Sequence, residues 1–406
     1  MKLWMKILIA LILGVCTGIV LGEDAIYLKP LGTVFLSLIN MIIVLLILAS
    51  MTVGITSIHD PEKLSRLGGK TVLVYTTTTL LAISGGMIFA TIFSPGSELH
   101  LQMPVEELPA PPSLGSILIS MIPTNPIAAL AGGNILQIIV FSIFLGISIN
   151  FAGERGKPLL HFLQSLADVM YRMTSIVMEF SPIGVFGIMA WVAGTFGVAL
   201  LFPLLKFLGL YYLACIVHFV LVYGTLLKGM GKLQLLPFLR GMGDAIMMAF
   251  STCSSAATLP VALHCLQQNL GVSERISQFV MPLGITMNMN GSAIFQSMSA
   301  IFIAHAYGIS LDWGHYMTLL LTAFLSALGT AGIPGGGFVM LSVVLTSVGL
   351  PLEGLGILAG IDRLREMVTT TLNILGDAAV TLFIAKQEGE LNEQRYYHSA
   401  AIELEG

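Results

Sequence analysis

Six oxygen-bearing side chains gather on one face of the last long apolar segment of this 406-residue chain, positions 354–386. At about 100° per residue of an α-helix, they fall within about 100° of one another: Asp362, Glu366, Thr369, Thr370, Asn373 and Asp377. An apolar segment of this length can span a bilayer, where lipid cannot hydrate such groups, so they must meet protein, water or a cation. Carboxylate and amide oxygens suit a small cation. We therefore expect a cation site near Asn373 and Asp377.

Two arginines flank this face. Arg363 and Arg365 lie at about 100° and 300° from Asp362, where they can neutralise Asp362 and Glu366. A purely structural ion-pair network is the alternative explanation, but six polar side chains exceed what one pair needs. An intramembrane protease would need paired aspartates, and Asp362 and Asp377 are ~22 Å apart on one helix. We therefore favour a binding site and expect no enzyme activity.

Two runs of small residues are typical of the tips of helical hairpins. One is Ser251–Ser255, within the apolar segment 235–267, and the other is Gly329–Gly337, within the segment 313–350. Each segment is too long for one membrane crossing and too short for two with a turn. Glycine permits close approach of the backbone, and helix N-termini favour a carboxylate. Close packing of helices through small residues is the alternative, but two such tips in matching positions favour a substrate site.

The composition supports a membrane protein. Only 10% of the residues are charged, against roughly 25% in soluble proteins, and the mean hydropathy is +0.91. The net charge is −4 and the pI is about 6.1, so there is no basic face for nucleic acid. The sequence predicts an all-α polytopic membrane protein with two re-entrant hairpins and eight transmembrane helices at 4–22, 31–55, 70–93, 114–151, 158–193, 198–228, 273–307 and 354–386.

The basic residues predict the orientation of these helices. Most Lys and Arg fall in loops on one side, whereas the loop 94–113 has none. By the positive-inside rule, that loop lies outside and both termini lie in the cytoplasm, which agrees with eight crossings. A hairpin followed by a helix with a polar interruption occurs twice, at 288–292 and at 373–377, and indicates inverted repeats around a transport site.

Three motifs carry a resemblance to a known family. They are Pro282–Gly291 (PLGITMNMNG), Gly329–Gly335 (GTAGIPG) and Gly360–Asp362 continued by Asn373 and Gly376–Asp377. They resemble the sodium:dicarboxylate symporter family, the glutamate and neutral amino acid transporters, over nearly the whole chain. The resemblance implies a homotrimer in the inner membrane that works by an elevator mechanism. Its static scaffold would be residues 1–69 and 114–193, its mobile transport domain 70–93 and 198–386, and its cytoplasmic tail 387–406, which we expect to be disordered.

The resemblance also implies three sodium sites. The first comprises Gly284, Asn288, Asn373 and Asp377, the second the backbone near Thr286, Leu328 and Thr330, and the third Tyr75, Thr78, Thr79, Asn288 and position 290. The family has an aspartate at position 290, whereas this chain has Asn290. A neutral amide removes a formal charge opposite a cation. We therefore expect reduced sodium coupling, with a proton on Glu366 contributing instead.

The resemblance implies a substrate site made of Ser254, Ser255, Ser292, Ile333, Gly335, Glu366, Thr369, Thr370 and Asn373. Acidic amino acid carriers of the family have arginines at two positions that are Thr369 and Cys253 here. Without a bidentate guanidinium at Thr369, we expect a small neutral amino acid as the substrate. In the alternative, Arg365 substitutes and the substrate is an acidic amino acid or dicarboxylate, carried with protons or with fewer sodium ions. A passive channel is the rival from another class.

Overall fold

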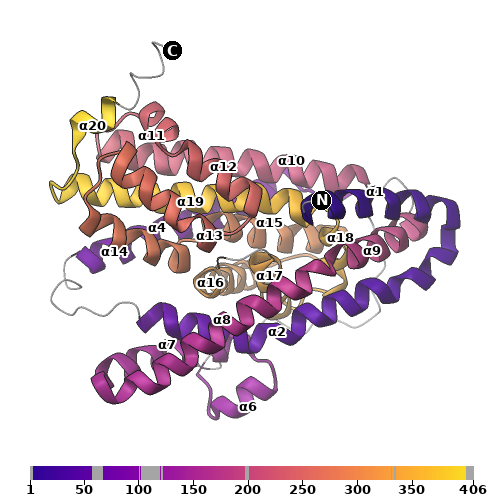
Figure 1. Ribbon diagram of the computed structural model, residues 1–406. Coiled ribbons are helices and arrows are strands. Elements are labelled where there is room, and N and C mark those ends of the chain that lie inside the picture. The colour runs from indigo at the N-terminus through magenta and orange to yellow at the C-terminus, as the bar shows by residue number, and fades with distance from the viewer. Residues whose placement is uncertain are drawn as a thin grey trace.

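The computed structural model describes residues 3–56, 67–99, 101, 119, 122–196, 201–330, 332 and 335–398. Within these residues every regular element is a helix, and the single extended pairing is the isolated bridge between Val272 and Leu391. The predicted all-α fold is confirmed. Figure 1 shows most of the helices running roughly side by side along the long axis of the molecule.

One group of helices comes from the first half of the chain. α2 (Lys29–Thr56) packs against α7 (Ile135–Ala152), α8 (Lys157–Glu179) and α9 (Ser181–Phe196), and α1 (Leu3–Leu21) packs against α9. Glycines allow the close contact of α1 with α9, because a Cβ on Gly18 would lie 2.3 Å from the carbonyl oxygen of Ala190. Small residues at helix contacts are typical of packing within a membrane.

A second group surrounds α19 (Asp362–Gln387). Its neighbours include α4 (Gly69–Phe93), α10 (Leu201–His218), α14 (Glu274–Met287) and α15 (Asn290–Ala306). α10 continues through the π-helical turns η5 (Phe219–Tyr223) and η6 (Thr225–Met230). Most residues of α19 are buried, including the charged Arg363, Arg365, Glu366 and Asp377, and Figure 1 shows this helix inside the group.

Both segments predicted as hairpins reverse direction. The first consists of α11 (Leu235–Gly241), α12 (Gly243–Thr252), α13 (Ser255–His264) and η7 (Cys265–Asn269), and turns at Cys253 with φ 54°. The second consists of α16 (Trp313–Gly329) and α17 (Gly336–Val348), with Gly335 at φ 84° before α17. The two tips touch, because the Ala256 amide donates to the Gly332 carbonyl at 3.0 Å.

Four helical stretches among the described residues are long and apolar enough to cross a membrane: Ile9–Phe35, Gly69–Phe93, Phe202–Met230 and Asp362–Gln387. The eight crossings stay a prediction. Several predicted spans are not single helices. The segment 114–151 contains the short α6 (Pro126–Ala131) before α7, because Asn125 and Asn134 each cap a new helix start. The segment 158–193 breaks at Phe180, and 354–386 divides into α18 (Glu353–Ala359) and α19.

The two polar interruptions differ. The one at 288–292 is a real break, because α14 ends at Met287 and α15 begins at Asn290. The predicted interruption at 373–377 is wrong, since α19 continues through it without a break. The polar side chains of α19 in this stretch bond to groups at the break between α14 and α15. One broken segment therefore packs against one continuous helix.

The C-terminal residues 388–398, which we call the strap, are ordered and lie across the base of the first hairpin. Ser273 N donates to Glu390 O at 3.1 Å and Asn392 N donates to Gly271 O at 2.9 Å. The Glu390 carboxylate accepts from Ser273 Oγ at 2.5 Å and from Arg275 Nη1 at 3.0 Å. The predicted disorder of the tail is therefore wrong for this part, because neighbouring loops satisfy its backbone. Residues 399–406 lie outside the described residues.

Tyr396 anchors the strap, and its loss should destabilise the protein. The side chain is fully buried, and its hydroxyl donates to the Gln234 carbonyl at 2.6 Å. Tyr396→Phe removes one buried hydrogen bond, so we expect the free energy of unfolding to fall by about 1 kcal/mol. Unfolding of the purified protein followed by tryptophan fluorescence measures it. Tyr397→Phe, at an exposed neighbouring ring, is the control, and an equal loss there would contradict the assignment.

Candidate substrate and cation site

The break between α14 and α15 opens the site. Asn288 (φ −122°, ψ 55°) and Met289 (φ −86°, ψ 55°) leave the helical region, so the first amides of α15 need outside partners. One partner comes from α19, where Asn373 Oδ1 accepts from the Gly291 amide at 2.7 Å. A Cβ on Gly291 would lie 2.7 Å from the Thr369 carbonyl oxygen, so only glycine permits this approach of the two helices.

A polar cavity lies between this break, α19 and the two hairpin tips. Six predicted substrate residues line it: Ser255, Ser292, Glu366, Thr369, Thr370 and Asn373. Thr330, predicted near a cation site, lines it as well. Two further lining residues, Cys253 and Arg365, were considered in the sequence as a family arginine position and as the alternative anchor. Sequence reasoning had not assigned the remaining ones to the substrate site: Met289, Gly332 and Gly337. The structure therefore brings both tips and both helices around one space.

Two other predicted substrate residues, Ser254 and Gly335, do not line the cavity but bond to residues that do. Ser254 caps α13 by accepting from the Ala257 amide at 3.2 Å, and its hydroxyl donates to the Gly332 carbonyl at 3.1 Å. The Gly335 amide donates to the Glu366 carboxylate, so the second tip is tied directly to α19. Ile333 lies outside the described residues.

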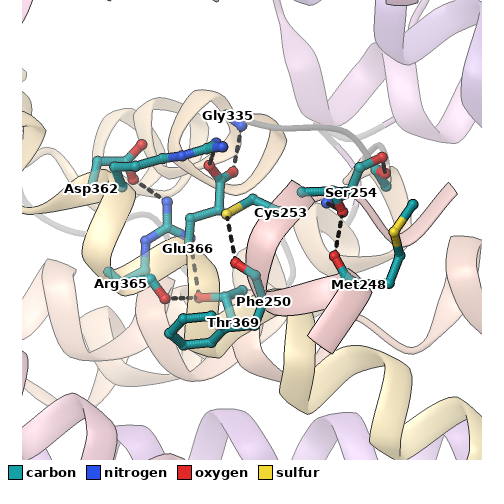
Figure 2. A network of polar contacts seen from close by, with 12 residues as sticks. Met248, Phe250, Cys253, Ser254, Gly335, Asp362, Arg365, Glu366 and Thr369 are labelled. Atoms are coloured by element: carbon teal, nitrogen blue, oxygen red, sulfur yellow. Dashed lines mark hydrogen bonds and ion pairs between the residues drawn. The ribbon is translucent and has the colours of Figure 1, made fainter. Parts of the chain in front are cut away.

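Four charged side chains in and beside the cavity neutralise one another. Figure 2 shows Arg365 paired with Asp362 and the Glu366 carboxylate reaching the Gly335 amide. Arg363 Nη1 is 3.3 Å from the other oxygen of Glu366. The two arginines and two acids leave no net charge, as burial of ionised groups requires.

Arg365 is the most deeply placed cation of this group. Its side chain is fully buried, its guanidinium carbon lies 4.0 Å from the centre of the Phe295 ring, and Nη1 donates to Thr369 Oγ1 at 3.3 Å. Its Nε is buried without a hydrogen-bond partner. An unsatisfied buried donor is unfavourable unless a ligand accepts its hydrogen bond. Arg365 thus lines the cavity with a positively charged side chain, one turn before Thr369.

A second polar cluster, which we call the cation cluster, lies deeper along α19: Tyr75, Thr78, Thr79, Asn288, Asn290 and Asp377. Asn288 Nδ2 donates to Asp377 Oδ1 at 2.9 Å, and Thr78 Oγ1 donates to Asn288 Oδ1 at 3.0 Å. A Cβ on Gly284 would lie 2.5 Å from Asp377 Oδ1 and 2.6 Å from Tyr75 Oη. Glycine at this position, predicted as part of the first sodium site, therefore leaves room for the Asp377 carboxylate.

Asp377 carries the only formal charge of the cation cluster. It is fully buried, and its Oδ2 has no hydrogen-bond partner. A buried carboxylate with a free oxygen among amide and hydroxyl oxygens fits a monovalent cation, which would offset the charge and fill the vacant ligand position. The donors around Gly284, Asn288 and Asp377 therefore fit the predicted first sodium site, whereas Asn373, also predicted there, bonds the Gly291 amide and lines the substrate cavity.

Asn290 is bound to other groups of the protein. Thr79 Oγ1 donates to Asn290 Oδ1 at 2.8 Å, and Asn290 Nδ2 donates to the Tyr223 hydroxyl at 2.7 Å. Tyr75, also predicted as a ligand, is fully buried and donates its hydroxyl to the Val280 carbonyl at 3.0 Å. The predicted third site is thus a network of neutral groups around an amide.

The predicted second sodium site is not assembled by side chains. The Thr286 hydroxyl donates to the Leu283 carbonyl at 2.9 Å, and the Thr330 hydroxyl donates to the Ser326 carbonyl at 2.8 Å. Both bonds stay within their own helices. Leu328 is a partly buried residue of α16 that packs on the core. A cation here would depend on backbone carbonyls alone.

Comparison with known proteins shows to which family this chain belongs. The model of the sodium:dicarboxylate symporter family matches residues 3–387. A proton/sodium-glutamate symport protein of Geobacillus stearothermophilus is 34% identical, covering 96% of this chain and 95% of the relative. The proton/glutamate-aspartate symporter of Escherichia coli K12 is 34% identical over 96% and 94%, and a C4-dicarboxylate transport protein of Rhodospirillum rubrum is 34% identical over 97% and 90%. The chain therefore belongs to the sodium:dicarboxylate symporter family.

Proposed function

We propose that this protein is a secondary active transporter that couples the entry of sodium ions, with protons as a second coupling ion, to the uptake of a small molecule bearing two carboxylates. Both an acidic amino acid and a C4-dicarboxylate fit this description. The relatives described above are named for glutamate, aspartate and C4-dicarboxylates. The buried Arg365 side chain, which lines the cavity and bonds to Thr369, is the observation that carries the proposal.

The expectation of a neutral amino acid is replaced. It rested on the absence of an arginine at position 369, where this chain has Thr369. The guanidinium of Arg365 nevertheless reaches the Thr369 hydroxyl, because residues four apart on a helix are neighbours. A planar guanidinium with a free donor is the side chain best suited to a carboxylate. The acidic alternative, with Arg365 as the anchor, therefore becomes the main proposal.

Charge balance explains why such a substrate would need cations. The four charged groups around the cavity already cancel, so a substrate with two carboxylates adds negative charge to a buried space. Uncompensated charge there is strongly unfavourable. A cation beside Asp377 offsets the carboxylate of the cluster, and further cations or protons must offset the substrate. Coupling follows because substrate and cations are buried together more favourably than either alone.

The test is uptake into proteoliposomes that contain the purified full chain. Labelled aspartate, glutamate, succinate, alanine and serine are offered under separate sodium and proton gradients. We expect accumulation of at least one acidic substrate against its gradient, driven by sodium, and little uptake of alanine or serine. Preference for a neutral amino acid would overturn the substrate assignment. Ion conductance without substrate accumulation would support the passive channel instead.

Asn290 should limit the number of coupled sodium ions. The Asn290 amide is neutral and already bonded on both sides, so a cation there would gain no formal charge opposite it. Asn290→Asp is expected to steepen the sodium dependence of substrate binding, because it adds a carboxylate ligand. The Hill slope of substrate affinity against sodium, measured at several pH values, tests this prediction. Equal slopes in the two proteins would show that Asn290 does not set the coupling.

The elevator movement and the homotrimer are part of the same proposal. α16 and α17 of the second hairpin contact α2, and α16 also contacts α7. In the proposed cycle this boundary slides while α1, α2 and α7–α9 stay fixed. Light scattering of the detergent-purified protein measures the number of chains. A cross-link between α16 and α2 should stop uptake while leaving substrate binding intact.

A further inference from the structure

Two tyrosines on one helix hold the two consecutive residues at the start of α15. Tyr223, at the end of η5, accepts a hydrogen bond from Asn290 Nδ2 at 2.7 Å. Tyr211, on α10, donates to the Gly291 carbonyl at 3.2 Å, and its hydroxyl lies 2.5 Å from Thr369 Oγ1. Both rings are fully buried. The same helix therefore reaches the cation cluster through one hydroxyl and the substrate cavity through the other.

The position of Tyr223 is fixed from both sides. Its ring stacks edge-on against His218 at 5.0 Å between centroids, and the π-helical turn η5 lies between these two residues. Turns of this kind occur often at functional sites. Its hydroxyl oxygen would lie only 2.2 Å from a Cβ on Gly376, the residue before Asp377. The phenol thus enters the cation cluster where glycine leaves room for it.

This contact holds one end of the Asn290 amide. Thr79 donates to the amide oxygen and Tyr223 accepts from the amide nitrogen, so a hydroxyl binds the amide at each end. With the hydroxyl removed, the amide nitrogen would be a buried donor without this partner, or the amide would turn toward Asn288 and Asp377. Either outcome disturbs the groups around the free oxygen of Asp377.

We propose that Tyr223 is a positioning residue of the cation cluster, acting through Asn290 and not through the substrate cavity. This inference rests on the proposed cation coupling, but it goes further by assigning a residue outside the predicted ligand set. It makes the cluster depend on α10 and η5 as well as on α4, α14, α15 and α19.

The test uses sodium binding to the purified full chain, measured as the rise of its unfolding temperature with sodium concentration. Tyr223→Phe keeps the ring and removes the hydroxyl. We expect the half-saturating sodium concentration to rise about tenfold, the effect of leaving a buried donor unpaired. The control is Tyr212→Phe, which removes a hydroxyl that donates to the Leu364 carbonyl at 2.8 Å. It should keep the wild-type sodium midpoint within about twofold.

A double-mutant cycle separates positioning from general loosening of the helix. In an Asn290→Ala background, Tyr223→Phe should shift the sodium midpoint by less than about twofold, because its partner is gone. A full shift in that background, equal shifts for Tyr223→Phe and Tyr212→Phe, or no sodium stabilisation of the wild type would overturn the inference. Uptake is not needed for this readout. Failure to transport any acidic substrate would therefore reject the proposed function without deciding the role of Tyr223.

Discussion

Asp377→Asn is expected to abolish sodium-driven uptake and to leave a folded protein. Asp377 is the one formally charged group of the cation cluster, and its Oδ2 has no hydrogen-bond partner among the residues that the structure describes. Without that charge nothing offsets the dehydration of a cation at this depth. We expect uptake to fall by at least about a hundredfold, which corresponds to the loss of a few kcal/mol of cation binding. Proteoliposome uptake under a sodium gradient measures it.

The control and the contrary outcome are clear for this variant. Asp244→Asn makes the same chemical change at an exposed position in the first turn of α12, and it should keep wild-type uptake. Size-exclusion chromatography and unfolding temperature show whether each variant is folded. Wild-type sodium dependence in a folded Asp377→Asn protein would contradict the assignment of the cation cluster.

Removing the guanidinium of Arg365 should weaken the binding of an acidic substrate, and placing a guanidinium at position 369 should partly restore that affinity. In Arg365→Met the cavity loses its guanidinium, and charged hydrogen bonds to the substrate of roughly 1.5 to 3 kcal/mol each are lost. We expect affinity for aspartate or succinate to fall by about a hundredfold if two such bonds are made. Adding Thr369→Arg to this variant places a guanidinium one turn away on the same face, which should recover about tenfold.

Isothermal titration with aspartate and with succinate, at saturating sodium, measures both effects. Arg275→Met, at an arginine on the exposed end of α14, is the control for loss of a positive charge. Arg365→Met also leaves Asp362 without its partner, and the double variant tests whether that alone is responsible, because Arg at 369 can serve the cavity. Unchanged affinity in Arg365→Met would show that Arg365 only neutralises Asp362.

The buried face of α19 could be predicted from the sequence because it depends on local spacing alone. The 3.6-residue period places Glu366, Thr369, Thr370 and Asn373 on one side, and these four line the cavity. The same wheel placed Arg365 at the edge of that face. It lines the cavity because Phe295, from another helix, covers its guanidinium. Such a contact between distant segments has no signal in the spacing of one helix.

The roles of Tyr211 and Tyr223 could not be predicted from helical spacing. On a regular α-helix these two tyrosines would point about 120° apart, with no reason to reach adjacent residues. The π-helical turn η5 changes the rotation between them. Tyrosines in a largely apolar stretch are a weak signal. The break at Asn288 was predicted, but only the structure shows that the continuous helix α19 supplies its missing partner through Asn373.

The strap over the first hairpin has a consequence for biosynthesis. Tyr396 bonds to the carbonyl of Gln234, 162 positions earlier in the chain. Membrane proteins are made from the N-terminus, and early domains fold while the rest is still being synthesised. The base of the first hairpin must therefore wait in an incomplete state, with Gln234, Gly271 and Ser273 lacking their final partners, until the second hairpin and α19 have been made. Ribosomes stalled before residue 390 should leave this loop exposed to proteases or chaperones, and completion of the strap should mark the end of that vulnerable period.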